Sequence, residues 1–317
     1  MEVTKQDFCA PSSDGIHTLR GVVYLPKGEA RGYFQVVHGM TEYIGRYDRF
    51  MKEMAEAGWI TFGYDHLGHG HTARDDSELG YIAKKNGRDY LARDVGGFFE
   101  AVRTAFPSDK KLPYCLMGHS MGSFTVRVAT ERYVSPDRLI VMGTGGANLA
   151  AGPGLVLIAL LKRIYGDRHI SKLIAKLSFG SYNKRFEKEL EEAPAPWLTT
   201  DASVRLKYAG DKFCTFSFTV SAMGDLIRLI KECNRAAWYR SIPAGFPVLL
   251  ISGEDDPVGN YGKGVREVSA LLETAGADVK CILYPGARHE ILNDFTYEET
   301  VKDIRAFCED GHEGSYQ

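Results

Sequence analysis

Apolar runs of strand length recur along the chain, separated by longer segments that have one apolar face. The runs predict buried strands at residues 32–37, 59–64, 112–117, 139–142, 247–251 and 279–284. Residues 16–25 alternate apolar and polar side chains instead, which is typical of an early antiparallel strand. Between the strands, residues 47–57, 89–106 and 123–133 are predicted to be helices.

Two further helices are expected near the C-terminus. They are marked by apolar stripes at Val265, Val268, Leu271 and Leu272, and at Val301, Ile304 and Phe307. Thr296 and Glu299 have the spacing of a capping box at the start of the last helix. Repeated strand–helix units predict an α/β fold, with a mostly parallel central sheet and helices on both of its faces.

The strand–helix alternation stops between Gly143 and Pro247. This stretch contains an aliphatic run at 155–161, too short to span a bilayer, followed by several basic residues. Six large apolar residues follow, namely Trp197, Phe213, Phe216, Phe218, Met223 and Trp238. We expect residues 144–246 to form a helical cap on a core of residues 1–143 and 247–317. The cap would give the pocket an apolar lining, and its aliphatic run suits transient contact with a membrane surface.

The segment Gly118-His119-Ser120-Met121-Gly122 fits G-x-S-x-G, the nucleophile elbow. It lies between a predicted strand and a predicted helix, where the motif is far less common by chance than in a loop. A serine on such a sharp turn has strained backbone dihedrals, and its hydroxyl stands clear of the sheet. The tight bend leaves no room for side chains two residues on either side, which suits the two glycines.

A serine nucleophile needs a base, and the base needs an acid that orients it. On this fold the chain order is Ser, then Asp or Glu, then His. His289 follows a predicted strand and a Pro-Gly turn. The candidate acids Glu254, Asp255 and Asp256 follow another strand. We favour Asp256 over Asp255, because the proline after Asp256 restricts its backbone.

Two upstream loops complete the predicted site. His38-Gly39-Met40 follows the strand at 32–37, where this fold supplies one oxyanion-hole amide. The backbone N–H groups of Met40 and Met121 are therefore the expected oxyanion donors. The second loop contains three histidines in a glycine-broken stretch, His66, His69 and His71. No carboxylate or cysteine completes an obvious metal shell, so we interpret this loop as a structural turn supporting the site.

Composition narrows the class of protein. The 317 residues suit one large domain with an insertion. With 39 basic and 41 acidic residues and a net charge of −2, nothing suggests nucleic-acid binding. The six cysteines have no C-x-x-C or metal-finger spacing, which suggests a reducing compartment. Of these, Cys115 and Cys281 are expected to be buried in core strands. The N-terminal residues lack the apolar core of a signal peptide, so a cytoplasmic protein, peripheral to a membrane at most, is expected.

Taken together, the motifs resemble those of the monoacylglycerol lipase and lysophospholipase group of α/β-hydrolases. Besides the elbow, the matching segments are His38-Gly39-Met40, Asp65-His66-Leu67-Gly68-His69-Gly70, Gly253-Glu254-Asp255-Asp256-Pro257-Val258-Gly259 and Arg288-His289-Glu290-Ile291-Leu292-Asn293. The resemblance covers roughly residues 10–310 and is weakest across the cap. It places the acid on Asp256 and the base on His289. It implies hydrolysis of carboxylic esters that carry acyl chains, with no metal or organic cofactor.

The expected reaction is attack of Ser120 on an ester of a monoacylglycerol or lysophospholipid, through an acyl-enzyme. The same superfamily includes serine aminopeptidases, so the fold alone does not decide the substrate. An aminopeptidase or amidase would need a cap carboxylate to bind the substrate amine. The acidic run Glu187, Glu189, Glu191 and Glu192 is available, but we interpret it as a solvated helix face. An acyltransferase that uses the same triad, or a catalytically inactive binding module, would also fit these motifs.

Overall fold

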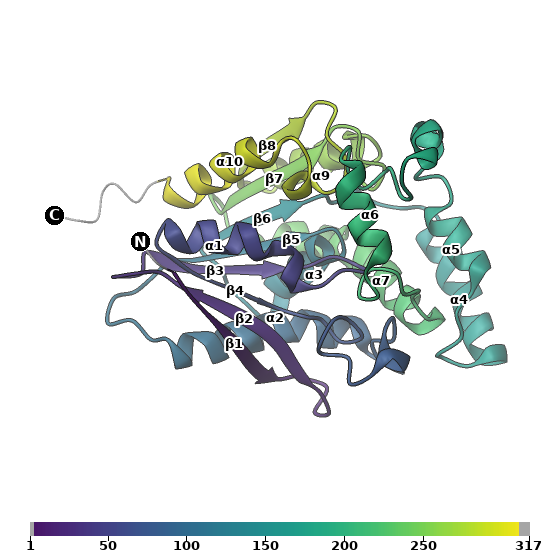
Figure 1. Ribbon diagram of the computed structural model, residues 1–317, viewed down its shortest axis with the longest axis horizontal. Coiled ribbons are helices and arrows are strands. Elements are labelled where there is room, and N and C mark those ends of the chain that lie inside the picture. The colour runs from purple at the N-terminus through teal and green to yellow at the C-terminus, as the bar shows by residue number, and fades with distance from the viewer. Residues whose placement is uncertain (1–2, 311–317) are drawn as a thin grey trace.

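The computed structural model describes residues 3–310 and contains an eight-stranded sheet in the order β1-β2-β4-β3-β5-β6-β7-β8 (Figure 1). The strands are β1 (Thr4–Pro11), β2 (Thr18–Leu25), β3 (Gly32–Val37), β4 (Trp59–Tyr64), β5 (Tyr114–His119), β6 (Arg138–Met142), β7 (Pro247–Gly253) and β8 (Asp278–Tyr284). The first two strands are antiparallel to their neighbours, and all pairs from β4 to β8 are parallel. The predicted α/β fold with a mostly parallel sheet is confirmed.

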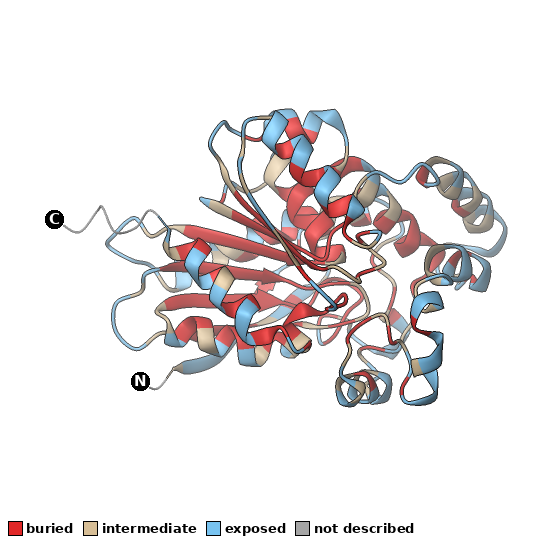
Figure 2. Cartoon of the chain, turned by 90° about the horizontal axis from the view of Figure 1, so that it is seen from above, coloured by how far each residue is buried: buried red, intermediate tan, exposed pale blue. Residues whose placement is uncertain are grey.

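Helices cover both faces of the sheet. On one face lie α1 (Asp48–Glu56) and α10 (Tyr297–Glu309), and on the other lie α2 (Gly87–Ala105), α3 (Met121–Arg132) and α9 (Lys263–Thr274) (Figure 1). Every residue of β3, β4 and β5 is buried as a result, and buried residues concentrate in the sheet (Figure 2). Burial on both faces is why these strands form continuous apolar runs in the sequence.

Two local predictions are wrong, and one strand has no counterpart among the predicted elements. The edge strand β1 was not expected, because most of its residues are exposed and polar. Cys281 is exposed rather than buried, since β8 is the opposite edge strand and much of it is exposed. The capping box is absent at Thr296, whose hydroxyl donates to the carbonyl oxygen of Ile291 at 3.2 Å instead of capping α10.

Between β6 and β7 the chain forms a group of helices that we call the inserted segment (residues 144–246). It contains α4 (Ala151–Tyr165), α5 (Lys172–Phe179), a 3-10 helix (Lys184–Glu191), α6 (Ala202–Gly210), α7 (Val220–Cys233) and α8 (Ala236–Ser241). Of these, α4, α5 and α6 lie beyond the carboxyl ends of the parallel strands (Figure 1), whereas α7 and α8 pack against α3. Open α/β sheets place their ligands at this edge. Further 3-10 turns lie at Ile44–Tyr47, Asp76–Glu78 and Ile291–Asn293.

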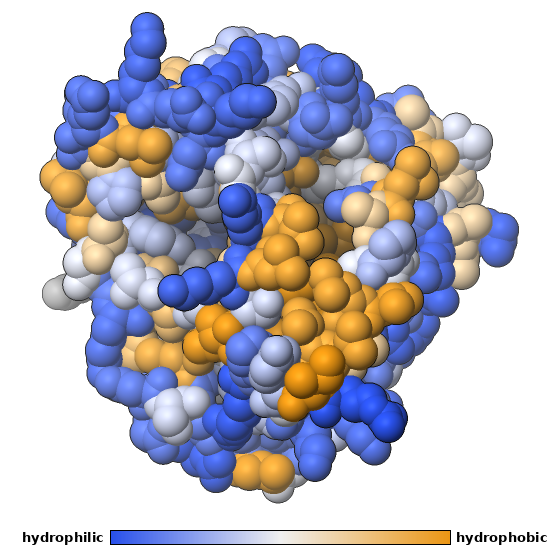
Figure 3. Space-filling model, turned by 90° about the vertical axis from the view of Figure 1, so that its right-hand side faces the viewer, coloured by the Kyte–Doolittle hydropathy of each residue, from blue (hydrophilic) through white to orange (hydrophobic). Residues whose placement is uncertain are grey.

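The outer side of α4 and α5 exposes many large apolar side chains (Figure 3). We call this group the apolar patch; its members are Leu149, Val156, Leu160, Ile164, Ile170, Leu173 and Leu177. Among residues 3–310, no helix combines the length and the apolar composition needed to cross a bilayer.

Candidate active site

Ser120 occupies the turn between β5 and α3, with φ 53° and ψ −120°. Such values are strained for a residue other than glycine and persist only where the surroundings impose them. The flanking glycines show how tight the turn is. A Cβ on Gly122 would lie 2.1 Å from the carbonyl oxygen of Val37, and one on Gly118 would lie 2.4 Å from that of Gly122. The elbow therefore has the strained geometry that the sequence predicts.

The structure brings His289 and Asp256 together from loops that follow neighbouring strands. Nδ1 of His289 lies 2.9 Å from Oδ2 of Asp256, and both side chains are buried. The carboxylate of Asp256 also accepts a hydrogen bond from the backbone N–H of Val258 at 2.8 Å, which fixes its direction. Asp255 points elsewhere, with its side chain 28% exposed and paired with Arg185 at 2.9 Å. The geometry thus favours Asp256 as the acid.

Gly143, at the end of β6, leaves the space that the histidine rings occupy. Its φ is +61°, and a Cβ there would lie 3.2 Å from ring carbons of both His119 and His289. The centroids of these two rings are 4.8 Å apart. Any larger residue at position 143 would push the rings aside, so we regard this glycine as a part of the site that sequence reasoning missed.

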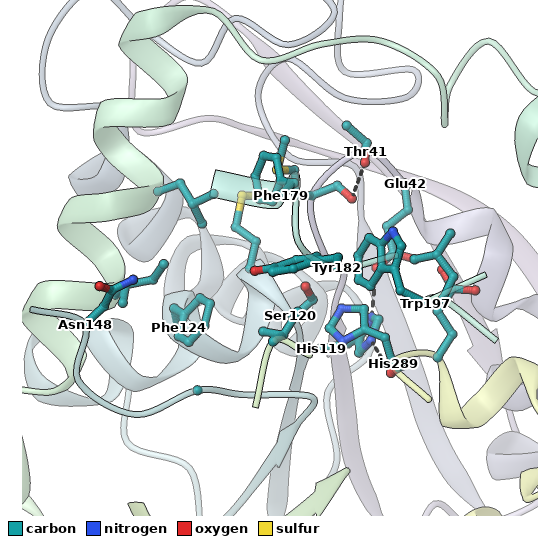
Figure 4. Close-up of a pocket in the computed structure, with 18 of the residues that line it drawn as sticks. Thr41, Glu42, His119, Ser120, Phe124, Asn148, Phe179, Tyr182, Trp197 and His289 are labelled. Atoms are coloured by element: carbon teal, nitrogen blue, oxygen red, sulfur yellow. Dashed lines mark hydrogen bonds and ion pairs between the residues drawn. The ribbon is translucent and has the colours of Figure 1, made fainter. Parts of the chain in front are cut away.

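Ser120 and His289 face a cavity of about 280 Å³ (Figure 4). Met40 and Met121, the expected oxyanion residues, also line it. Its apolar walls come from Phe124, Phe179, Trp197, Leu198, Leu226, Ile230 and Val258, and its polar lining from Thr41, Glu42, Asn148, Tyr208 and Glu290. In the close-up, the ring of Tyr182 lies directly over Ser120 (Figure 4).

The loop carrying Met40 packs tightly against the elbow. A Cβ on Gly39 would lie 2.9 Å from Cβ of Ser120, so a glycine is needed for this approach. The side chain of His38 connects this loop to the 64–72 loop, because its Nε2 accepts a hydrogen bond from the backbone N–H of His66 at 2.9 Å. Burial lowers the pKa of His38 and lowers that of His69 to about 3, which keeps these rings neutral.

The contacts of the 64–72 loop agree with a structural turn. Besides the bond to His38, Nδ1 of His69 lies 3.0 Å from the carbonyl oxygen of Leu67, and Nε2 of His66 lies 3.2 Å from that of His38. Within residues 3–310, no three His, Cys, Asp or Glu side chains are grouped as metal ligands would be.

A buried polar network under the elbow was not predicted. Glu42 accepts a hydrogen bond from Tyr47 at 2.9 Å and lies 3.0 Å from Nδ1 of His119. Burial favours a raised pKa for Glu42, but the hydrogen bond and charge of His119, together with Arg46, outweigh it and lower the pKa. Burial likewise opposes the charged form of His119, yet Glu42 raises its pKa. Arg46 also forms a two-pronged ion pair with Glu290. The signal available in the sequence was a Glu and an Arg four residues apart, just after His38-Gly39-Met40.

The acidic run of the inserted segment is only partly a solvated face. Glu187, Glu191 and Glu192 are exposed as expected. Glu189 differs, because its carboxylate accepts two hydrogen bonds from the guanidinium of Arg288.

The Glu42–His119 pair makes stability depend on pH. We expect Glu42→Gln to lower the free energy of unfolding by about 2 kcal/mol, since it leaves buried donors poorly satisfied. The pKa of Glu42 is lowered from 4.5 and that of His119 is raised from 6.5. The wild-type advantage should therefore be largest between pH 4.5 and 6.5. It is lost toward acid as Glu42 becomes protonated, and toward alkali as His119 loses its proton. Urea unfolding of both proteins below, within and above this window measures it; an advantage independent of pH would contradict the pairing.

Comparison with known proteins identifies the family of the chain. Residues 28–296 match the family model described as serine aminopeptidase, S33. A monoacylglycerol lipase of Mycolicibacterium smegmatis is 24% identical over 292 residues, which cover 90% of each chain. A thermostable carboxyl esterase from Bacillus coagulans, solved in complex with glycerol, is 30% identical with a TM-score of 0.88 over 96% of this chain and 97% of that one. A soluble variant of the Saccharomyces cerevisiae monoglyceride lipase, solved with a substrate analog, has a TM-score of 0.72 at 18% identity over 98% and 95% of the two chains, and supports the fold alone. The chain belongs to the serine aminopeptidase S33 family of α/β-hydrolases, and monoacylglycerol lipases are among its relatives.

Proposed function

We propose that this carboxylic ester hydrolase cleaves esters of lipid-like acyl chains, such as monoacylglycerols or lysophospholipids, with Ser120, His289 and Asp256 as its triad. One observation carries the proposal: Ser120 and His289 face a largely apolar cavity, and His289 is hydrogen-bonded behind the cavity to the buried Asp256. In this proposal, residues 144–246 act as a cap over the cavity.

In the acylation step, Ser120 Oγ attacks the ester carbonyl while Nε2 of His289 accepts its proton. Asp256 holds the ring by Nδ1 and stabilises the imidazolium that forms. The backbone N–H groups of Met40 and Met121 donate to the oxyanion, each contributing about 3 kcal/mol to the stability of the transition state.

Acylation ends when the tetrahedral intermediate collapses: the ester C–O bond breaks and His289 gives its proton to the departing alcohol, which leaves the acyl-enzyme. In the deacylation step, water enters, His289 removes one of its protons, and the hydroxide attacks the acyl-enzyme carbonyl. Collapse of the second intermediate releases the carboxylic acid and returns the proton to Ser120.

The two sides of the cavity suit the two ends of such an ester. Phe124 lies on one side of Ser120, whereas Thr41 and Glu42 lie on the other (Figure 4). Leu226 and Ile230 add to the apolar lining of the cavity. This arrangement supports an acyl chain on the apolar side and a hydroxylated alcohol on the polar side.

The cavity favours an ester over an aminopeptidase substrate. Binding a substrate amine needs a carboxylate that is free to pair with it. Among the described residues that line the cavity, the acids are Glu42 and Glu290, and both are paired with Arg46. We therefore expect p-nitrophenyl esters to be cleaved and aminoacyl-naphthylamides to be poor substrates. Faster cleavage of the naphthylamides would favour the aminopeptidase, and transfer to an added alcohol in preference to water would favour an acyltransferase.

Labelling with a fluorophosphonate tests the proposed nucleophile. The reagent needs an activated serine, so we expect a single adduct, which peptide mass spectrometry should locate on Ser120. An adduct on another serine, or the failure of the folded protein to react, would overturn the proposal.

We further propose that the apolar patch touches lipid surfaces. Residues 149–177, which carry the patch, include five basic residues and one acidic residue, although the whole chain has a net charge of −2. A segment that combines exposed apolar side chains with an excess of basic residues suits the boundary of a lipid layer, especially one with anionic headgroups. Substrate dispersed in such a layer would then meet the protein beside its cavity.

Two patch residues provide the test. Leu160→Ser with Ile164→Ser should lower activity on monoacylglycerol in vesicles by about tenfold or more, because each side chain loses roughly 1.5–3 kcal/mol of burial. Activity on a soluble short-chain ester should stay unchanged. Leu271→Ser, on α9, is a matched control at a residue that is 41% exposed and lies outside the patch. Equal losses on both substrates would contradict a lipid-facing role.

A further inference from the structure

A short strap of the inserted segment, residues 194–200, lies on the loop that carries His289. The backbone N–H of Glu290 donates to the carbonyl oxygen of Leu198 at 2.8 Å. The N–H of His289 itself donates to the carbonyl oxygen of Trp197 at 3.4 Å. The main chain of the proposed base is thus hydrogen-bonded to a segment almost a hundred residues away in sequence.

The strap has a stiff backbone. Pro194 and Pro196 each have a fixed φ, and Ala195 between them has a φ of 52°. A positive φ at a residue other than glycine costs of order 1 kcal/mol in backbone strain, which the surrounding contacts must offset. A strap held this way is a firm support for the loop beneath it.

Arg288, the residue before His289, uses its guanidinium to bind the inserted segment. It forms a two-pronged ion pair with Glu189, with N–O distances of 2.8 and 2.6 Å. It also donates to the carbonyl oxygen of Pro196 at 2.7 Å and lies over the ring of Phe186 at 4.1 Å. Only 7% of Arg288 is exposed. Because its guanidinium is planar and binds the carboxylate of Glu189 through two parallel hydrogen bonds, the pair fixes both the position and the orientation of the Arg288 side chain.

The ring of His289 has neighbours from both parts of the chain. Asp256 holds Nδ1, and the ring of His119 lies 4.8 Å away on the core side. From the strap, the ring of Trp197 lies 5.0 Å away (Figure 4). A hydrogen bond at Nδ1 fixes one atom of the ring, whereas the direction of Nε2 toward Ser120 also depends on where the backbone of His289 lies.

We infer that the Arg288–Glu189 ion pair positions the base: by tying the backbone beside His289 to the inserted segment, it holds Nε2 in line with Ser120. Arg288 and Glu189 are positioning residues in this account, which rests on the proposed role of His289. Misplacing a reacting group by about 1 Å can cost roughly a hundredfold in rate, so this support matters to the chemistry.

A second ion pair supplies a matched control. Arg185, on the same 3-10 helix as Glu189, pairs with Asp255 at 2.9 Å. This pair also joins the inserted segment to the core, but its side chains are 54% and 28% exposed and it holds no residue next to His289. If the Arg288–Glu189 pair only attached the inserted segment to the core, its removal should affect kcat as little as removal of the Arg185–Asp255 pair.

The experiment compares Glu189→Gln, Arg288→Lys and Arg185→Gln at a temperature well below their Tm. For Glu189→Gln and Arg288→Lys we expect kcat and kcat/KM to fall together by about ten- to a hundredfold, which indicates loss of an interaction that serves the transition state. The rate of fluorophosphonate labelling should fall by a similar factor. The downfield proton resonance of the His289–Asp256 hydrogen bond should broaden. Arg185→Gln should remain within about twofold of wild type, as expected for an exposed pair.

If Glu189→Gln and Arg288→Lys lower Tm but keep wild-type kcat, labelling rate and the downfield resonance, the pair is structural and the inference is overturned. Ser120→Ala is measured beside them to separate the two proposals. Full activity of Ser120→Ala would overturn the proposed function and the inference with it. An inactive Ser120→Ala beside a fully active Glu189→Gln would overturn the positioning role alone.

Discussion

Ser120→Ala should lower kcat/KM for a p-nitrophenyl ester by about ten-thousandfold or more, since no acyl-enzyme can form without the hydroxyl. The activity that remains would come from substrate binding and the oxyanion donors. Alanine also has a Cβ, so the strain at φ 53° is much the same in the variant, and the fold should be retained. Steady-state kinetics measures the loss, and thermal unfolding of the same samples provides the control. A Ser120→Ala protein that kept more than about one per cent of wild-type activity would show that another group is the nucleophile.

Asp256→Asn should lower kcat by about ten-thousandfold, because an amide favours the wrong tautomer of His289. The neighbouring variant Asp255→Asn should change kcat little, since that side chain is 28% exposed and paired with Arg185, which is itself exposed. The two variants differ by one position and carry the same chemical change. Kinetics of both on one ester, with Tm recorded, compares them directly. A larger effect at Asp255 than at Asp256 would show that the acid is misassigned.

The central strands could be predicted from the sequence because each is buried on both faces. β3 and β4 begin and end where the apolar runs do, at residues 32–37 and 59–64. An edge strand has no such signal. β1 is mostly exposed and polar, and it is a strand because it pairs with β2 along its whole length. Cys281 shows the same limit on the opposite edge, where an apolar run in the sequence does not mean burial.

The candidate site likewise contains residues that could be predicted from the sequence and residues that could not. The elbow and the loops of Asp256 and His289 depend on short-range geometry, namely a glycine turn or a proline after a strand, and their residues can be recognised one motif at a time. Glu42 and the contact of Trp197 with His289 could not be found like this. Glu42 acts on His119, which is 77 residues away, and Trp197 meets the His289 ring across the boundary between the inserted segment and the core. Such contacts arise only when the sheet brings distant loops to one edge.

The helices of the inserted segment can be expected from the sequence, but which of their apolar residues are buried and which are exposed cannot. Some of the segment's apolar residues are buried and others form the exposed patch, and their spacing in the sequence does not distinguish the two groups. Ile158 and Leu229 are buried, whereas Val156 and Leu160 belong to the exposed patch. Burial depends on how α4 packs against α7, which neither helix specifies alone.

The most direct test of the account is hydrolysis of p-nitrophenyl esters from acetyl to palmitoyl, together with a monoacylglycerol, by wild type and Ser120→Ala. We predict a preference for medium or long chains that disappears in Ser120→Ala, because the cavity beside the elbow is largely apolar. Activity confined to acetyl and butyryl esters would contradict the lipid-like substrate and point to a hydrolase of small esters or amides.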